Sequence, residues 1–173
     1  MDREVLKVKV KCLANNEEYY LEFPADINLD EYSIVDYSSD LLVDDFMIYG
    51  ANINQLNNLV RMTNDLGDDD FKKLNVILSS GEYAFDINEV LDVISNLDLF
   101  EVVYGANDYY ELGKYLACED EMDYEKYGEE VFEADNGMFL DDVCLLCEDP
   151  CYRKEKSKCK YVAIILKFFG DII

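Results

Sequence analysis

Acidic side chains dominate the middle of this chain and constrain what it can fold into. Residues 13–152 contain 35 Asp and Glu but five Lys and Arg, while the whole 173-residue chain contains 39 and 15, a formal charge of −24. The two end segments, residues 1–12 and 153–173, are both net basic. Because self-repulsion among carboxylates opposes a compact sphere, the sequence predicts an elongated molecule that spreads its charge.

The composition nevertheless predicts a folded protein. Half of the residues are apolar (50%), and they include 14 Tyr and 9 Phe. Acidic disordered chains are poor in aromatic and β-branched residues. Two interpretations of the acidic surface remain open: an ordinary solvated face, or a surface that imitates DNA. Residues 13–152 have a net charge of −30, from 35 acidic and five basic residues. At one charge per about 1.7 Å, this corresponds to about 50 Å of DNA duplex.

Several functional classes are excluded or disfavoured by the residues themselves. The chain has no His, which excludes Ser-His-Asp and Cys-His catalysis and His-ligated metals. The acidic surface would repel phosphates, so direct binding to nucleic acid is not expected. The N-terminus lacks an apolar signal core, and the apolar stretch 161–169 is too short to span a bilayer. We therefore expect a cytoplasmic protein with mostly reduced cysteines.

Hydrophobic periodicity predicts a mixture of strands and helices. Residues 4–12 alternate between lysines and apolar side chains, as in a half-buried strand. A helix is expected to begin at Asn52, and another at Asp86, which opens a capping box with Glu89. Further strands are expected at 19–23, 32–37, 99–104 and 161–169, and further helices at 68–78 and after Asn107.

These elements predict an α+β fold, an elongated chain of three small α/β units with an acidic surface and a Cys-rich C-terminal extension. The expected domains are an N-terminal α+β domain (1–66), a central mainly helical domain (67–100), a C-terminal acidic α+β domain (101–152), and a basic linker with a final strand (153–173). A short repeat, Ile48–Asn52 and Val103–Asn107, suggests that a strand-turn-helix unit is used twice.

Four cysteines near the C-terminus form a candidate zinc site. Cys144, Cys147, Cys151 and Cys159 have the spacing C-x2-C-x3-C-x7-C, and four thiolates suit tetrahedral zinc. Structural thiols or an adventitious disulfide are the alternatives. No other cofactor is expected. The carboxylates lack the spacing of an EF-hand loop, and among so many acids no pair indicates a glycosidase, so no catalytic residue is nominated.

Short motifs along residues 5–140 point to a family. In the first half they are LEFP (21–24), EYSIVDY (31–37) and NQLN (54–57), and in the second half YYELGKY (109–115), DYEKYG (123–128) and NGMF (136–139). In this order they resemble the ArdA antirestriction proteins. Two departures are that Glu129 and Glu130 follow Gly128, where the family commonly has Arg and then an acid, and that the chain continues well beyond Phe139.

The resemblance implies an elongated homodimer encoded by a mobile genetic element, which inhibits type I restriction-modification enzymes and is not an enzyme itself. In that family, carboxylates follow the phosphate path of DNA and occupy the DNA groove of the methyltransferase core. The alternatives are an acidic inhibitor of another DNA-binding defence protein, such as a CRISPR effector, and a Cys-rich metal-binding protein.

The candidate phosphate-mimicking residues are drawn from acidic clusters of the chain. They are Asp44, Asp45, Asp68, Asp69, Asp70, Glu119, Asp120, Glu121, Asp123, Glu125, Glu129, Glu130 and Glu133. Because exposed charge pairs contribute about 0–1 kcal/mol each, no single carboxylate is expected to dominate binding.

Overall fold

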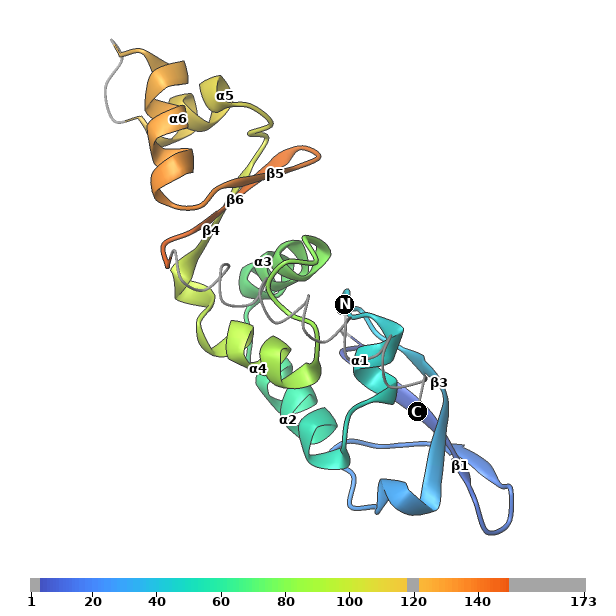
Figure 1. The fold of residues 1–173 in the computed structure, drawn as a ribbon. Coiled ribbons are helices and arrows are strands. Elements are labelled where there is room, and N and C mark those ends of the chain that lie inside the picture. Colours follow the sequence, from blue (N-terminus) through green and yellow to red (C-terminus); the bar gives the residue numbers. More distant parts are fainter. Residues whose placement is uncertain (1–3, 118–121, 150–173) are drawn as a thin grey trace, which may run out of the picture. The chain divides into compact units, whose positions relative to one another are not determined.

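The protein has an α+β fold in the computed structural model, which describes residues 4–117 and 122–149. Helices accompany two small antiparallel sheets of three strands each (Figure 1). Contacts divide the chain into two compact units. The first extends to Ser79 and includes Ala84–Ser95, and the second comprises Ser80–Tyr83 and the chain from Asn96 onward.

This grouping differs from the three units expected from the sequence. The expected boundary between residues 66 and 67 lies inside the first unit, because helix α2 (Ile53–Asn64) contacts helix α4 (Ile87–Ser95) across it. The predicted strand at 161–169 lies outside the described residues.

The sheet of the first unit confirms the alternation seen in the sequence. Its order is β2-β1-β3, formed by β1 (Lys7–Cys12), β2 (Glu18–Tyr20) and β3 (Tyr32–Ser38), with η1 (Leu29–Glu31) leading into β3. Val8 and Val10 are fully buried, while Lys7 on the other face is exposed. The register shifts between Lys9, opposite Asp36, and Val10, opposite Ile34, so the extra residue of this irregularity, Val35, lies on β3.

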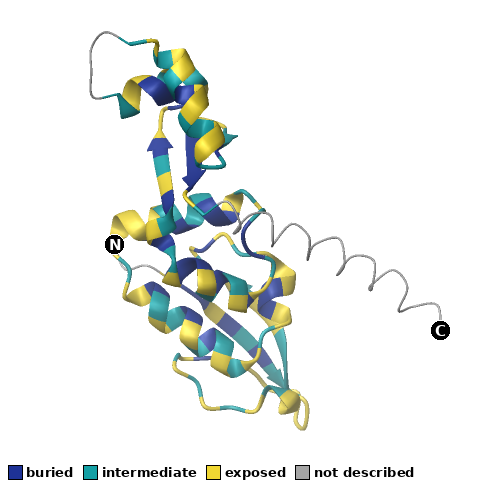
Figure 2. Ribbon diagram, turned by 60° about the vertical axis from the view of Figure 1, so that its left-hand side comes forward, coloured by how far each residue is buried: buried dark blue, intermediate teal, exposed yellow. Residues whose placement is uncertain are grey.

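Four helices complete the first unit, each burying one apolar stripe while its other face is exposed (Figure 2). Asn52 and Gln55 form a reciprocal capping box at the start of α2, as the pattern of a helix beginning there predicts. Asn75 joins α3 to the loop between β3 and α1, accepting from the Leu42 amide (2.8 Å) and donating to the Asp40 carbonyl (3.0 Å). The helices are α1 (Asp45–Tyr49), α2 (Ile53–Asn64), α3 (Asp68–Ser79) and α4 (Ile87–Ser95).

The second unit is built around strand β6, which is buried along its whole length. Its sheet order is β4-β6-β5, and residues of β4 and β6 join Leu112 of α5 in one apolar core. Phe132 and Phe139 pack against that core, and their rings and the ring of Tyr109 contact one another with centroids 4.6–5.5 Å apart. The elements are η2 (Leu97–Leu99), β4 (Phe100–Tyr104), α5 (Tyr109–Leu116), α6 (Tyr124–Ala134), β5 (Met138–Leu140) and β6 (Val143–Cys147).

Helices α5 and α6 approach each other at two glycines. A Cβ built on Gly113 would lie 1.8 Å from the Tyr124 carbonyl oxygen, and one on Gly128 would lie 1.9 Å from that of Tyr109. Only glycine fits at such distances. The two helices are therefore in backbone contact, which fixes the position of the side chains that α6 presents to solvent.

The repeated pentapeptide has two different structures, which corrects the expectation of a reused strand-turn-helix unit. Ile48–Asn52 begins in the last residues of a helix, α1, and Asn52 caps α2. Val103–Asn107 begins in the last residues of strand β4 instead, and the next residue, Asp108, caps α5. Gly50 has right-handed backbone angles, whereas Gly105 has a φ of +82°. Identity at four of five residues does not fix the turn, because packing of the preceding element decides it.

Among the helices of the described part, none is long and apolar enough to cross a lipid bilayer.

Candidate functional site

The nominated carboxylates that the structure describes are all exposed. They fall into three groups, which we name by their helices: the α1 acids (Asp44, Asp45), the α3 acids (Asp68, Asp69, Asp70) and the α6 acids (Asp123, Glu125, Glu129, Glu130, Glu133). The first two groups lie in the first unit and the third lies in the second. Glu119, Asp120 and Glu121 lie outside the described residues.

One of the α1 acids is held in place by a neighbouring strand. The Tyr37 hydroxyl on β3 donates a hydrogen bond of 2.7 Å to Asp45 Oδ1. The Tyr37 ring also packs edge-on against Tyr49 of α1, with centroids 6.0 Å apart. Burial and the bond to Asp45 raise the pKa of Tyr37 to about 12, so the phenol remains a donor at neutral pH. Asp45 is therefore a carboxylate of fixed orientation.

The α3 acids are three consecutive residues in the first turn of their helix. The partial positive charge at a helix N-terminus stabilises carboxylates there by about 0.3–1 kcal/mol each. Lys72 approaches Asp69 at 3.3 Å, and both side chains are largely exposed. The helix dipole thus offsets part of the mutual repulsion of a cluster that would otherwise oppose folding.

The α6 acids begin with a helix cap and continue along the exposed side of the helix. Asp123 accepts a hydrogen bond of 3.2 Å from the Lys126 amide, which makes it the N-cap. Glu125, Glu129 and Glu133 then recur every four residues, so they form one stripe. Lys126 pairs with Glu130 at 3.8 Å on the surface. The α6 acids therefore consist of Asp123, which caps the helix, and exposed glutamates that follow it along the helix.

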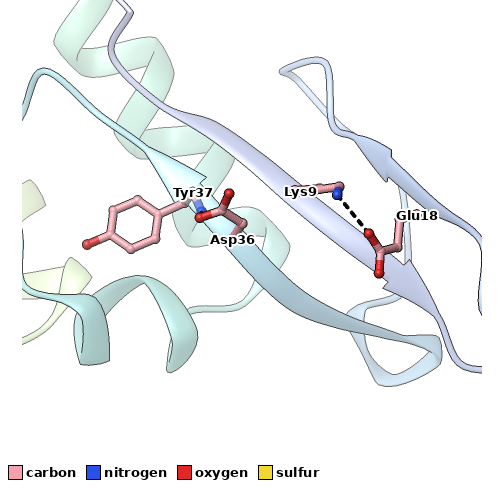
Figure 3. Close-up of polar contacts among 4 residues, drawn as sticks. All are labelled: Lys9, Glu18, Asp36 and Tyr37. Carbon is pink, nitrogen blue, oxygen red and sulfur yellow. Dashed lines mark hydrogen bonds and ion pairs between the residues drawn. The ribbon is translucent and has the colours of Figure 1, made fainter.

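Lysines of β1 neutralise part of the charge in the first unit. Lys9 and Glu18 meet across strands β1 and β2 at 2.7 Å (Figure 3). Their hydrogen bond raises the pKa of Lys9 and lowers the pKa of Glu18. Asp36 stands opposite Lys9 in the register of β1 and β3. This side of the sheet is thus less negative than the helices.

Many exposed acids were not nominated from the sequence, although some, such as Asp141 and Asp142, form a pair just as Asp44 and Asp45 do. The signal that could have found them is a polar position in an otherwise amphipathic pattern. The exposed ones include Glu22, Asp26, Asp30, Glu31, Asp36, Asp65, Asp98, Glu101, Asp141, Asp142 and Glu148.

The described cysteines of the candidate zinc site lie on opposite faces of one strand. Cys144 and Cys147 are three residues apart in β6, so their side chains point to different sides of the sheet. Burial raises the pKa of Cys144 to about 11 and also raises the pKa of Cys147, which disfavours the thiolates that bind zinc. Cys151 and Cys159 lie outside the described residues. This arrangement favours structural thiols.

Within residues 4–117 and 122–149, no three Cys, Asp or Glu side chains are placed to hold a metal ion together.

No protein-family model matches the chain, and no curated protein does either. The function of the surface is therefore inferred from its own residues, which are exposed carboxylates at defined positions on helices.

Proposed function

We propose that this protein is an antirestriction DNA mimic, encoded by a mobile genetic element, which inhibits type I restriction-modification enzymes by occupying their DNA-binding groove. It acts in the cytoplasm as a homodimer, without cofactor or catalysis, and its partner is the methyltransferase core. The observation that carries the proposal is that the nominated carboxylates of the described residues are all exposed and most lie on helices. Carboxylates on a scaffold of this kind can stand in for phosphates.

The α6 acids support the proposal through their density. Five carboxylates occur between Asp123 and Glu133, a distance of about 15 Å along the helix at a rise of about 1.5 Å per residue. One DNA strand carries about four or five phosphates over the same length, at about 3.4 Å each. The helix therefore offers about the linear charge density of one DNA strand.

Preorganisation would let such a surface compete with DNA. Duplex DNA must often be bent to fit an enzyme, which costs about 1–6 kcal/mol. A folded mimic does not incur that cost when it binds, and it loses little side-chain freedom where carboxylates are already held. Tyr37 holds Asp45, and the cap of α6 holds Asp123. These two contacts are the clearest examples of fixed phosphate substitutes in the chain.

The partner is inferred from charge complementarity. A groove that binds phosphates is lined by Lys and Arg, and a surface with 35 acids against five bases between residues 13 and 152 is attracted to it. The same field repels nucleic acid. A CRISPR effector has a similar basic channel, so a pull-down from lysates of both kinds of host distinguishes the two targets.

A protection assay in cells tests the proposal. Cells with an active type I system are challenged with unmodified phage, with and without this protein. We expect the protein to raise the plating efficiency, and we expect less protection when Glu125, Glu129, Glu130 and Glu133 are all changed to Gln. Substitution of the same four residues by Asp keeps the charge and serves as the matched control. Unchanged restriction at full expression of the folded protein would contradict the proposal.

A further inference from the structure

A surface hollow in the second unit has walls unlike the rest of the acidic surface. It has a volume of about 230 Å³ and is lined by Tyr104, Gly105, Ala106, Glu111, Lys114 and Tyr115. The end of strand β4 forms one wall and helix α5 forms the other. Gly105, with a φ of +82°, makes the turn between them, and its amide donates a bond of 2.7 Å to the Asp142 carbonyl.

Two tyrosine rings at this hollow are exposed to solvent. Tyr104 is 57% exposed and Tyr115 is 64% exposed, which are the largest values among the exposed aromatic side chains of the described residues. Tyrosine is usually at least half-buried, and a ring that stays exposed beside a concavity offers a face for a ligand. The faces of aromatic rings attract cations.

The charges around the hollow also favour a cation. Glu111 places a half-buried carboxylate in its lining, and Asp141 and Asp142 are exposed in the turn bonded to Gly105. Between residues 96 and 149 the chain has 17 acidic residues and two basic ones. The opposing feature is Lys114, whose ammonium lies 4.0 Å from Glu111 and 5.9 Å from the centre of the Tyr110 ring. Both contacts are long, and the Lys114 side chain is 57% exposed, so it can move aside.

We propose that this hollow binds the guanidinium group of an arginine side chain. The planar group would stack on a tyrosine ring and pair with the Glu111 carboxylate, which a planar fork of donors can do in a bidentate way. A lysine ammonium is a strongly hydrated point charge and fits this combination less well. The source of the arginine rests on the function proposed above: it comes from the basic groove of the target enzyme.

A titration of the isolated protein tests the site without any target enzyme. N-acetyl-arginine amide and N-acetyl-lysine amide are added at low ionic strength, and backbone amide shifts are followed by NMR. We expect the arginine probe to shift the amide signals of Gly105, Ala106 and Lys114, with a dissociation constant on the order of 10 mM. Binding should be this weak because it depends on one cation–aromatic contact and one exposed ion pair. Equal response to both probes, or no response at these amides, would overturn the proposal.

Substitutions define the chemistry of the ligand. Tyr115→Ala and Glu111→Gln should each weaken the arginine probe about 2- to 5-fold. Lys114→Met should strengthen it, because it removes a competing cation; if the hollow instead binds anions, that substitution weakens binding and the proposal is wrong. Tyr20→Ala, Glu22→Gln and Lys126→Met are matched controls at exposed sites outside the hollow, and they should leave the affinity unchanged.

The outcomes separate this site from the function on which its ligand rests. If the probe binds as expected but the protein does not bind a methyltransferase core, the hollow stands and the proposed target is wrong. If the core is bound but the probe leaves Gly105 and Lys114 unaffected, the DNA mimic stands and the arginine site is wrong.

Discussion

At the crossing of α5 and α6, Gly113 and Gly128 leave no room for any side chain. A Cβ on either would come within 2 Å of a carbonyl oxygen on the other helix. These glycines belong to the YYELGKY and DYEKYG motifs, so the structure gives those motifs a packing role. The helix that carries the α6 acids depends on that packing.

Replacing Gly128 by Ala should therefore destabilise the second unit. Forcing a methyl group into backbone contact costs about 1–3 kcal/mol or more, and the loss should appear in urea unfolding followed by circular dichroism. Gly67→Ala is the matched control, because a Cβ there meets only the flexible Asp70 carboxylate at 3.9 Å. The control should change the unfolding free energy by less than about 0.5 kcal/mol. Equal effects of the two substitutions would refute the close crossing.

Burial of Cys144 should make the fold sensitive to alkaline pH. Burial raises the pKa of Cys144 to about 11 from an ordinary value near 9, so the folded state favours the neutral thiol. This contribution is complete below pH 9 and is lost as the pH rises towards 11, on the order of 2 kcal/mol by pH 10.5. Urea midpoints at pH 8 and pH 10.5 measure it. Cys144→Ala should show a smaller drop between the two pH values than the native chain, and an identical drop would contradict this.

At the scale of elements, an acid at a helix start stabilises the helix and, under the proposed function, also contributes to binding, and Asp123 allows the two contributions to be separated. Asp123→Asn removes the charge but keeps an acceptor for the Lys126 amide, whereas Asp123→Ala removes both. We expect the Ala variant to lose about 0.5–2 kcal/mol of stability and the Asn variant to lose little. Both should bind the target almost as well as the native protein does. A large loss of binding with Asn alone would mark Asp123 as dominant, against a distributed surface.

Strong periodic patterns predicted much of the fold. The alternation of residues 4–12 became β1, and the apolar stripes after Asn52 and Asp86 became α2 and α4. These predictions succeeded because each element buries one face against its own unit. Strand β2 covers only three residues, fewer than expected, although the Leu21 amide beyond it still donates a hydrogen bond of 2.8 Å to the Val8 carbonyl of β1.

Two helices were not predicted. Helix α1 has five residues, which is too short for a periodic signal, and its position depends on Tyr37 and Tyr49. Helix α6 does have a signal, since Tyr124, Tyr127 and Val131 are spaced three and four apart, but dense acids and Gly128 obscured it. Gly128 weakens the helical pattern in sequence, yet in the fold it is the contact point with α5.

The candidate site was predictable only in part. Long acidic runs predicted exposed carboxylates, because ionised groups are almost never buried without partners. The bond between Tyr37 and Asp45 and the hollow beside Tyr104 were not predictable, since each joins different elements of a folded unit. The same holds for Cys144 and Cys147: their C-x2-C spacing suggested a shared metal, and only the strand shows that their side chains lie on opposite faces.

Across the whole molecule, both compact units carry acids on exposed helices, and few cations offset them. If these carboxylates replace phosphates, binding depends on their sum, so its strength should follow the ionic strength as it does for DNA. Neutralising the α6 acids should lower the salt dependence as well as the affinity. Replacing buried apolar residues would instead change the stability of the fold. The molecules that remain folded should bind the target with an unchanged salt dependence.

The most direct test is competition between this protein and duplex DNA for a purified type I methyltransferase core, measured over a range of salt concentrations. We expect the two to exclude each other, with the logarithm of the protein's affinity falling linearly as the logarithm of salt rises. The variant with Glu125, Glu129, Glu130 and Glu133 changed to Gln should have a shallower slope. Simultaneous binding of DNA and protein to one core, or no binding even at low salt, would contradict DNA mimicry.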